Sequence, residues 1–490
     1  MTDTLRGQFA SDTVSRHFED AALLTAMARV EAALAAAQAD AGQLDRSVAD
    51  RIEAVCVRRF GVAASVAGAP PGASHSTTRR GPGTPKPAEE NDPFSPATLA
   101  AAARRAGTLA IPFVKALTEA VAAEDPQAAR WLHRGATSQD VADTALALAV
   151  SAAGRELRAQ VARTGDALAR LADAHRGTML VGRTLLQPAT PVPFGWKAAC
   201  WLAPVTASYT GLVRALHDAG ALQLGGASGI RAALGGHGTK VAAAMAARLG
   251  LVDPGTSWHG SRDRIARLGA ELALATGAMA RIGRDLSLLM QGEVGETFEP
   301  TGEGRGGSSA MPHKRNPVAA MLAIQAGLRA PGLAATLLAQ LPGEHERGLG
   351  TWQADWWTLG ALFECAGSAT EAMGEAIEGL RVDQDAMREN LERTRGFVFA
   401  EAVTVVLSDA LGKPAAQAAM ERLCREAIER GEPLRDALLR ERSADAALAA
   451  ALPDARIDAL FDAGTQRGDA DAMIDRAIAD WRAAASLALR

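Results

Sequence analysis

The sequence predicts an all-helical protein, with three helical domains around a long central helix bundle. Apolar residues make up 48% of the chain and aromatic residues only 4%, and an interior filled mainly by alanine and leucine suits close-packed helices better than strands. Apolar residues also recur at spacings of three and four along extended stretches, as they do on one face of an amphipathic helix. With 490 residues, the chain is too long for one compact core. We therefore expect several helical domains and almost no sheet.

The first expected domain spans residues 1–107. Its helical pattern runs from Phe18 to about Phe60. Between about residues 62 and 96 this pattern gives way to a stretch that is rich in Pro, Gly, Ser and Thr. Such a composition cannot bury enough apolar surface to fold, so we interpret the stretch as a disordered insertion. An interaction arm built on its two neighbouring arginines, Arg79 and Arg80, is the alternative.

The second expected domain, residues 108–368, contains the longest helical patterns. The stretch that follows Gly260 predicts a helix of roughly ten turns. Helices of this length often bury their apolar stripes against copies of themselves, so we expect an oligomer. The third expected domain spans residues 369–490, with helix stops at Gly412-Lys413-Pro414 and Gly431-Glu432-Pro433.

Charge and cysteine content argue against several classes of protein. The formal net charge is only −4 and no block of like charge occurs, so we expect no nucleic-acid or membrane partner. No apolar run reaches the roughly eighteen residues of a membrane span, which makes the cytoplasm the expected location. No disulfide framework or zinc site is expected either, because the cysteines lie far apart without a metal-binding spacing; they are Cys56, Cys200, Cys365 and Cys424.

The segment GEGRGGSSAMPHKRNP, residues 302–317, carries the densest group of candidate catalytic residues. Its glycines let a loop open and close over a site, Lys314 supplies a positive charge, and Ser308 or Ser309 supplies a hydroxyl that can transfer a proton. The glycines also satisfy the GxGxxG pattern of dinucleotide-binding proteins. However, no apolar strand precedes them and Pro312 interrupts the expected helix, so we reject that interpretation.

A second segment, HRGATSQDVADT at residues 133–144, is a candidate carboxylate site. Thr137 and Ser138 can cap a helix that begins near Asp140, and the free amides at such a helix start attract an anion. Capping alone accounts for one hydroxyl. The neighbouring His133 and Arg134 favour a binding site over a simple cap.

Three segments resemble the signature regions of the aspartase/fumarase superfamily. Residues 307–317 resemble GSSxMPxKxNP, residues 133–140 resemble HxGxTSxD, and residues 182–191 resemble GRTHxQPAxP. The third segment departs at one position, because Leu185 stands where most lyases of the superfamily have a histidine. Met321 stands where the glutamate partner of that histidine usually lies. Losing both members avoids an unpaired carboxylate in a low-dielectric cleft, which indicates a re-specialised site.

In lacking both residues, the sequence is similar to the bacterial 3-carboxy-cis,cis-muconate cycloisomerases. This likeness covers nearly the whole chain outside the insertion. The resemblance implies a bundle of the aspartase/fumarase type, a homotetramer with shared active sites, a small tricarboxylate substrate, and no metal or cofactor. It also implies lactonisation to 4-carboxymuconolactone in protocatechuate catabolism. Three further features carry the likeness: ATPVPFG at residues 189–195, Trp258-His259 followed by Arg262-Asp263-Arg264, and GDADAMIDRAI near the C-terminus.

In the implied reaction, one substrate carboxylate adds to a conjugated double bond, and a proton reaches the carbon alpha to another carboxylate. Negative charge develops on that second carboxyl group, so fixed positive charge and aimed donors should stabilise it. Lys314 is the first choice, with Asn316, Thr137 and Ser138 as donors. The resemblance makes Ser308 the proton carrier, but a serine hydroxyl is a weak base and needs a positive setting.

His133 or a bound water is the alternative general acid. Further groups are available to bind the substrate, with a surface salt bridge as the alternative for the charged ones; they are Arg134, Arg183, Thr184, Gln187, His259, Arg262, His313 and Arg315. The acidic run before the loop, Glu293, Glu296 and Glu299, is not interpreted as a metal site, because the resemblance implies electrophilic assistance from the protein itself.

Two other functions stay open. One is another lyase of the superfamily, such as one that acts on adenylosuccinate, whose MPHKRNP loop is nearly the same; Leu185 and Met321 count against it. The other is a structural protein that keeps the scaffold without activity, since a fold does not guarantee function. The presence of Ser308, Lys314 and Asn316 counts against that second alternative.

Overall fold

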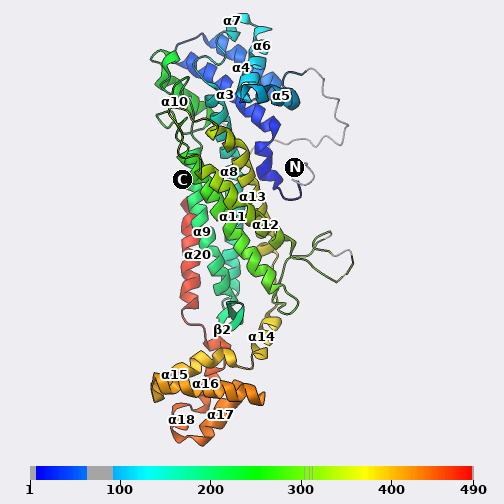
Figure 1. Cartoon of the computed structure of the whole chain (residues 1–490), viewed down its shortest axis with the longest axis vertical. Helices are drawn as coiled ribbons and strands as arrows, with labels where there is room; N and C mark the ends of the chain where they lie inside the picture. Colours follow the sequence, from blue (N-terminus) through cyan, green and yellow to red (C-terminus); the bar gives the residue numbers. More distant parts are fainter. Residues whose placement is uncertain (1–6, 63–91, 303, 308–309, 312, 488–490) are drawn as a thin grey trace. The chain divides into compact units, whose positions relative to one another are not determined.

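The computed structural model describes residues 7–62, 92–302, 304–307, 310–311 and 313–487. Helices dominate this part of the chain (Figure 1), so the predicted all-helical class is confirmed. Two small antiparallel sheets of two strands each accompany the described helices. They pair β1 (Met179–Thr184) with β2 (Gln187–Pro193), and β3 (Thr297–Phe298) with β4 (Arg381–Val382). Most of the stretch expected to be a disordered insertion lies outside the described residues.

The chain divides into two compact units, and neither is continuous in sequence. Unit 1 comprises Met1–Ala159, Gly211–Leu274 and Leu328–Ser368, and unit 2 comprises Gln160–Thr210, Ala275–Gly327 and Ala369–Arg490. The three-domain division expected from the sequence stays a prediction. Five long helices contribute residues to both units: α8 (Ser138–Ala174), α9 (Phe194–Ala219), α11 (Asp263–Leu289), α12 (Val318–Leu338) and α13 (Thr351–Glu378).

Shorter helices build the rest of unit 1 around a core that includes Met27, Leu34, Ile52 and Phe113. The helical pattern from Phe18 to Phe60 forms two helices, because the chain turns at Gly42 with φ +76°, a conformation that glycine adopts without strain. These elements are α2 (Asp12–Ser15), η1 (Arg16–Phe18), α3 (Asp20–Asp40), α4 (Arg46–Phe60), α5 (Pro96–Ala106), α6 (Ala110–Ala122), α7 (Pro126–Ala129), η2 (Ala232–Leu234) and α10 (Gly238–Leu249).

Helix α11 is shorter than the ten turns expected from its sequence pattern, and that expectation is wrong. The helix has 27 residues, which corresponds to about seven and a half turns. It stops at Leu289 because glycines follow at 292 and 295, and Gly295 turns the chain with φ +62°. The amide of Glu296 then donates to the carbonyl of Leu289, and the chain enters strand β3.

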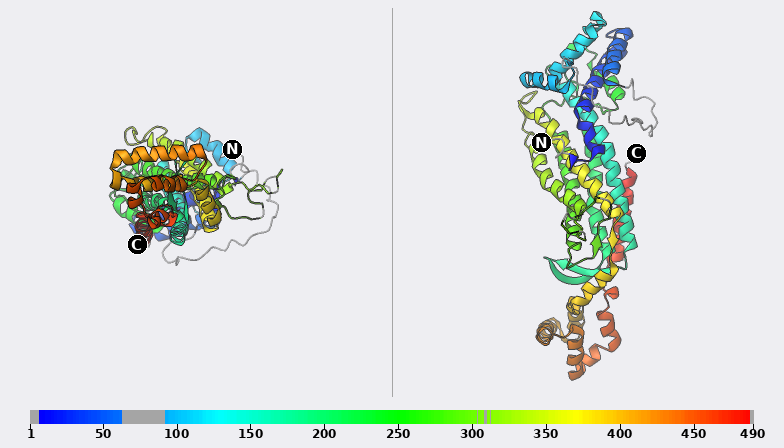
Figure 2. Two further views of the ribbon diagram at one scale, coloured as in Figure 1. Left: turned by 90° about the horizontal axis from the view of Figure 1, so that it is seen from below. Right: turned by 90° about the vertical axis from the view of Figure 1, so that its right-hand side faces the viewer.

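In unit 2, the last helix is anchored by an aromatic contact. Trp481 is buried, stacks edge-on against Tyr209 and donates from Nε1 to Asp166 Oδ1 at 2.8 Å. Gly165 makes room for it, since a Cβ there would lie 2.2 Å from the indole. In Figure 2, strands β1 and β2 form a curved ribbon within this unit.

The C-terminal helices of unit 2 enclose a small core of their own, which includes Val403, Leu423, Leu438 and Ile457. The predicted helix stops are confirmed: α15 ends before Gly412 and α16 ends before Gly431. The elements are α14 (Gln384–Arg393), η3 (Phe397–Phe399), α15 (Ala400–Leu411), α16 (Lys413–Arg430), α17 (Leu434–Ala444), α18 (Ala446–Ala451), α19 (Asp454–Leu460), η4 (Ala463–Thr465) and α20 (Ala470–Leu487).

Candidate active site

In unit 1, the turn that leads into α8 is held by the carboxylate of Asp140. The helix begins at Ser138, as the sequence predicts to within two residues. The amide of Thr137 donates to Asp140 Oδ2 at 2.9 Å, and the Asp140 side chain is buried. Thr137 and Ser138 are themselves only half-buried. They lie at the start of a 37-residue helix, where free amides favour an anion.

Sequence reasoning missed Arg347, which the structure places against the Thr137 hydroxyl. Its Nη1 donates to Thr137 Oγ1 at 3.3 Å, and its Nη2 donates to the carbonyls of Gly226 and Ala227 at 3.2 Å each. All three acceptors are uncharged. Among the described residues, the structure gives the guanidinium no carboxylate partner, and its buried Nε atom has no hydrogen bond. A positive charge without a counterion therefore lies beside a predicted carboxylate-binding group.

The sequence around Arg347 gives little indication that this residue belongs to the site. Arg347 lies in EHERGLG, residues 344–350, a short glycine-containing connection between α12 and α13. Nothing in that stretch distinguishes Arg347 from an ordinary surface arginine. The fold is required to bring it to Thr137, which lies 210 positions earlier in the chain.

His133 lies on the same turn and is tied to a buried glutamate. Its Nδ1 is 2.7 Å from Glu31 Oε1, and its amide donates to Glu31 Oε2 at 3.1 Å. Burial lowers the pKa of His133, but the charge and hydrogen bond of Glu31, aided by Asp140, more than offset burial and raise the pKa above its ordinary value. His133 therefore tends to keep its proton. Its neighbour Arg134 stacks on the Trp131 ring at 4.1 Å.

His259 and Arg262, both predicted to bind substrate, lie inside unit 1. The His259 side chain is 2% exposed and its Nε2 is 2.7 Å from Asp140 Oδ1. The Arg262 side chain is 1% exposed and donates to both oxygens of Asp143, at 2.8 and 2.9 Å. It also donates to Asp355. In this arrangement both side chains support the surrounding structure, and their binding of substrate stays a prediction.

The Arg262 cluster holds one guanidinium between two buried carboxylates. Burial raises the pKa of Asp355 to about 6; Arg262 opposes this shift, while the negative charge of Asp143 adds to it. The same two carboxylates raise the pKa of Arg262 against its own burial. Asp355 Oδ1 has no hydrogen-bond partner among the residues that the structure describes. The cluster is thus one positive charge short of full compensation when both carboxyl groups are ionised.

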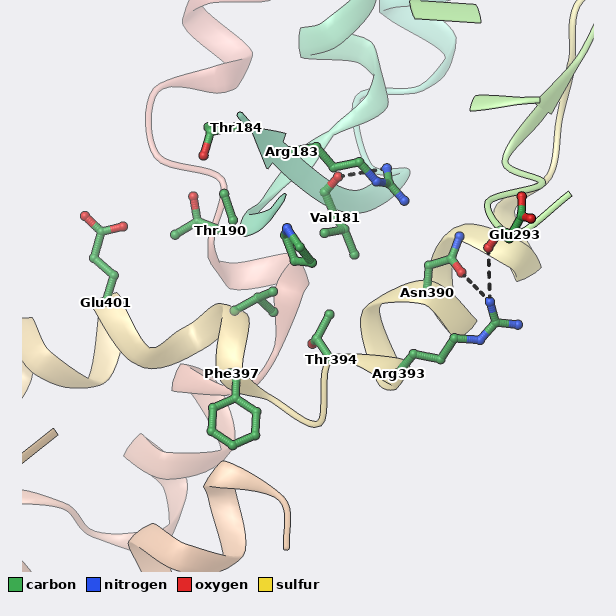
Figure 3. Close-up of a pocket in the computed structure, with 13 residues that line it drawn as sticks. Val181, Arg183, Thr184, Thr190, Glu293, Asn390, Arg393, Thr394, Phe397 and Glu401 are labelled. Atoms are coloured by element: carbon green, nitrogen blue, oxygen red, sulfur yellow. Dashed lines mark hydrogen bonds between the residues drawn. The ribbon is translucent and has the colours of Figure 1, made fainter. Parts of the chain in front are cut away.

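In unit 2, Arg183 of the β1–β2 hairpin is neutralised by a buried glutamate. Its guanidinium forms two parallel hydrogen bonds to Glu296, at 2.7 and 2.8 Å, and Asn390 donates to the same carboxylate at 2.8 Å. Figure 3 shows Arg183 with Thr184 and Thr190 at a cavity of about 750 Å³. The cavity also has acidic lining at Glu293 and Glu401. This mixture of charges does not favour an anion.

The hairpin ends in two exposed leucines. Leu185 is 97% exposed and Leu186 76% exposed, and both have positive φ, at 52° and 66°. They form a two-residue turn between Thr184 and Gln187, which pair across the two strands. Positive φ at both central residues is typical of a type I′ turn, which normally selects asparagine and glycine. Leucine is strained in this conformation, so the turn combines strain with unfavourable apolar exposure.

The signature loop presents its cations to the surface. Lys314 and Arg315 are exposed, as is His313, and Asn316 is half-buried. The amide of Asn316 donates to the carbonyl of Gly306 at 2.9 Å. A Cβ at Gly306 would lie 2.7 Å from the Asn316 carbonyl oxygen, so the loop requires glycine there. Ser308, the predicted proton carrier, lies outside the described residues.

Two of the three glutamates before the loop, Glu296 and Glu299, bind other residues of the chain. Glu299 accepts hydrogen bonds from the amides of Ala319 and Ala320, at 3.0 and 2.9 Å, and so caps α12. Glu296 binds Arg183 and Asn390. Within the described ranges, no group of three or more His, Cys, Asp or Glu side chains is arranged to hold a metal ion.

The contacts of the predicted site residues can be described within each unit. In unit 1 the structure brings Thr137 together with Asp140, His259 and Arg347. In unit 2, no hydrogen bond or ion pair joins the described loop residues to Arg183 or Gln187.

Family models, individual relatives and solved structures together match most of the chain. The lyase family matches residues 99–332, and the adenylosuccinate lyase C-terminus family matches residues 396–477. A 3-carboxy-cis,cis-muconate cycloisomerase of Bradyrhizobium diazoefficiens is 47% identical over 78% of this chain and 84% of its own length. A nitrosuccinate lyase of Streptomyces davaonensis is 39% identical over 96% of this chain and 93% of its own length. The crystal structure of the 3-carboxy-cis,cis-muconate lactonizing enzyme of Pseudomonas putida matches with a TM-score of 0.85 and 36% identity, over 99% of this chain and 100% of that one.

Proposed function

This chain belongs to the lyase family that contains the 3-carboxy-cis,cis-muconate cycloisomerases, and we propose that it catalyses the reaction for which they are named. The observation that carries the proposal is a paired departure from the superfamily pattern. The signature loop is kept, while Leu185 and Met321 replace the histidine and glutamate of most lyases. The missing pair is dispensable here, because the substrate supplies its own nucleophile.

The chemistry follows from that nucleophile. A substrate carboxylate oxygen forms a C–O bond to one end of the conjugated double bond, and the displaced electron pair moves toward a second carboxyl group. A proton then adds to the carbon alpha to that group, and the lactone results. Holding the carboxylate next to the alkene supplies a large part of the rate by proximity alone. No covalent intermediate with the protein is needed.

We propose that Thr137, Ser138 and Arg347 bind one substrate carboxylate. The guanidinium of Arg347 contacts a hydroxyl and two carbonyls and has no anionic partner among the described residues. A half-buried cation in this state is stabilised when a carboxylate arrives. The same carboxylate can accept hydrogen bonds from the free amides at the start of α8. His133 lies on the same turn, and its raised pKa favours the protonated form, but the charge of that form is paired with Glu31.

Ser308 and Lys314 are proposed as the groups that act on the reacting carbon. Lys314 is exposed and has no ion pair within the described part of the chain, so its charge is free to stabilise the developing carboxylate charge. Ser308 is proposed to deliver the proton when the lactone forms and to remove it when the lactone opens. Asn316 adds a hydrogen-bond donor.

We further propose a cytoplasmic homotetramer with shared active sites. Several large apolar side chains on the long helices are exposed, among them Leu328 at 77% and Trp357 at 74%, and burying them against another copy of the chain would be favourable. Helix α12 is long and apolar enough, by length and composition alone, to cross a membrane. However, it carries Arg329 in its middle, paired with Glu364 at 3.6 Å, and a charge there disfavours lipid. We therefore propose that other copies of the chain, and not lipid, cover these exposed apolar side chains.

An ultraviolet assay with three substrates tests the proposed function. The purified protein should consume 3-carboxy-cis,cis-muconate and leave adenylosuccinate and nitrosuccinate essentially unchanged. Nitrosuccinate is included because a nitrosuccinate lyase matches nearly the whole chain. Loss of the adenylosuccinate or nitrosuccinate absorbance alone would overturn the proposal.

The Ser308→Ala variant tests the proton carrier in the same assay. Removing the hydroxyl should reduce turnover of 3-carboxymuconate by at least about 100-fold, the usual contribution of general acid–base catalysis. Circular dichroism and the thermal midpoint should be unchanged. Ser309→Ala is the neighbouring control and should retain activity. Near-normal turnover by Ser308→Ala would assign the proton transfer to another group, with His133 the next to test.

A further inference from the structure

We propose that Asp140 and His259 form a buried positioning pair that sets the geometry of the Thr137 and Arg347 carboxylate site. Neither residue touches the substrate in this proposal. Their role is to fix two backbone turns, so that the binding groups face one carboxylate before it arrives. The inference rests on the proposed function for the identity of the ligand, whereas the positioning itself follows from the contacts of unit 1.

Asp140 uses both of its carboxylate oxygens. Oδ2 accepts from the amides of Thr137 at 2.9 Å and Gly226 at 2.8 Å, while Oδ1 accepts from the amide of Gly225 at 2.8 Å and lies 2.7 Å from His259 Nε2. Four contacts to one buried carboxylate exceed what a helix cap requires, since a cap needs only one bond to the residue before the helix. The other three contacts reach segments more than eighty positions away.

The contacts close a ring around the proposed site. Asp140 holds the Thr137 amide and the Gly226 amide; Arg347 then donates to the Thr137 hydroxyl and to the Gly226 carbonyl. The two residues that Asp140 holds are thus the same two that orient Arg347. If Asp140 releases either turn, the guanidinium and the hydroxyl lose their common alignment. Oriented binding groups are sensitive to displacements of this size.

Only glycine fits at both positions of the Gly225–Gly226 turn. A Cβ at Gly225 would lie 2.5 Å from Ser257 Oγ and 2.7 Å from His259 Cε1, and Gly226 has φ +70° with its Cβ position 2.9 Å from the Gly135 carbonyl oxygen. The turn is therefore clamped between His259 and the backbone that precedes Thr137. Close packing of this kind transmits a shift at one group to its neighbours.

The buried side chain of His259 contacts the carboxylate of Asp140. It is 2% exposed, with Nε2 on Asp140 and Nδ1 at 3.1 Å from Ser257 Oγ. Because an ionised carboxylate only accepts, Nε2 is the donor in this contact, and its hydrogen bond holds the rotation of the Asp140 carboxylate. Glutamine at this position places an amide donor near Nε2, while leucine fills similar space without a donor.

Four variants of the full chain test the inference: Asp140→Asn, His259→Leu, His259→Gln and Thr144→Val. Asp140→Asn puts an amide group opposite backbone donors and so breaks part of the ring. Thr144→Val is the matched control: the Thr144 hydroxyl bonds the amide and carbonyl of Gln223, which join α8 to the same segment without touching the ring. The readouts are hydrogen exchange of the Thr137, Gly225 and Gly226 amides, the kinetic constants, and the thermal midpoint.

We expect Asp140→Asn and His259→Leu to speed exchange at the three amides and to raise KM for 3-carboxymuconate by about 10- to 100-fold, as for a lost hydrogen bond to a charged group. Their kcat should change much less, and His259→Gln should restore KM most of the way. Thr144→Val should lower the thermal midpoint while KM and the three amides stay as in the parent protein.

Unchanged exchange at the three amides in Asp140→Asn would overturn the inference, whatever the substrate. A rise of KM in Thr144→Val equal to that in Asp140→Asn would also overturn it. The effect would then come from general loosening of the contacts between α8 and the segment that contains Gly225 and Gly226. If the parent protein does not turn over 3-carboxymuconate, the proposed function fails, and the exchange data still decide whether Asp140 holds the two turns.

Discussion

At the scale of single residues, the candidate arginines differ in whether a carboxylate neutralises their positive charge. Arg183 and Arg262 both occur in segments that the sequence singles out, yet each is held by buried carboxylates. Their partners are distant in sequence: Glu296 lies 113 positions from Arg183, and Asp355 lies 93 positions from Arg262. Residue type could therefore be predicted from the sequence, but charge pairing could not. Arg347 is the opposite case: its sequence context was uninformative, and only the fold shows that its hydrogen bonds to described residues go to uncharged acceptors.

Replacing Arg347 tests whether that free charge binds substrate. Arg347→Met removes the charge and the forked donors while keeping most of the side-chain volume. We expect KM to rise by about 10- to 100-fold, because a hydrogen bond to a charged group contributes roughly 1.5–3 kcal/mol. Arg347→Lys should recover only part of the loss, since an ammonium cannot reproduce the fork. Steady-state kinetics with 3-carboxymuconate provide the measurement, and an unchanged KM in Arg347→Met would exclude the role.

The His133–Glu31 pair predicts a pH-dependent contribution to stability. The folded pKa of His133 is raised, so its stabilising effect is fully present below the unfolded value of about 6.5 and is lost as pH rises through the folded value. Glu31→Gln should therefore cost most stability near pH 6 and less near pH 9, measured by denaturant unfolding. Glu378→Gln is the control, because its partner Arg163 stays charged throughout this range. A pH-independent cost in Glu31→Gln would contradict the assignment.

At the scale of elements, glycine and turn chemistry explain where sequence reasoning succeeded and where it failed. The helix stops at Gly412 and Gly431 were predictable because glycine follows each helix directly. The length of α11 was overestimated because apolar spacing continued past Leu289, while Gly295 and the pairing of β3 redirected the chain. The β1–β2 hairpin gave no turn signal at all, since leucines occupy a turn that usually selects asparagine and glycine.

The leucine turn yields a prediction in which stability and activity move in opposite directions. Leu185→Asn with Leu186→Gly should raise the free energy of unfolding by about 1–2 kcal/mol, through relief of left-handed strain. It should also lower kcat/KM by about tenfold or more, if the exposed leucines supply apolar surface to a shared active site.

Leu185→Ala separates the two effects, because it removes apolar surface without relieving the strain. It should lower kcat/KM without raising stability. Thermal unfolding and steady-state kinetics of both variants are sufficient. Full activity in both would mean that the tip has no part in the site.

At the scale of the whole molecule, the proposed assembly would cover large apolar side chains that are exposed on the long helices, among them Leu328 and Trp357. Helical periodicity was enough to predict the fold class, because that class depends on apolar stripes that the sequence displays directly, whereas the oligomer stays a proposal. The composition of the site was not predictable to the same degree. Its groups come from segments far apart in sequence, and their hydrogen bonds, such as those of Asp140, depend on how the helices pack.

Native mass spectrometry tests the assembly. The parent protein should have four times the 50.7 kDa mass of the chain. Leu328→Glu should shift it to smaller species and reduce activity, since burying an unpaired carboxylate in an interface is costly. Ile428→Glu changes another exposed apolar side chain, 67% exposed against 77% for Leu328, on the C-terminal helix α16, and should leave the assembly intact. A monomeric parent protein with full activity would exclude shared sites.

The most direct test of the central claim is nuclear magnetic resonance of the product formed from 3-carboxy-cis,cis-muconate in deuterated water. Intramolecular carboxylate addition predicts a lactone with a single solvent deuterium on the carbon alpha to a carboxyl group, formed without loss of any substrate fragment. Unchanged substrate, or an open-chain product to which water has added, would contradict the account.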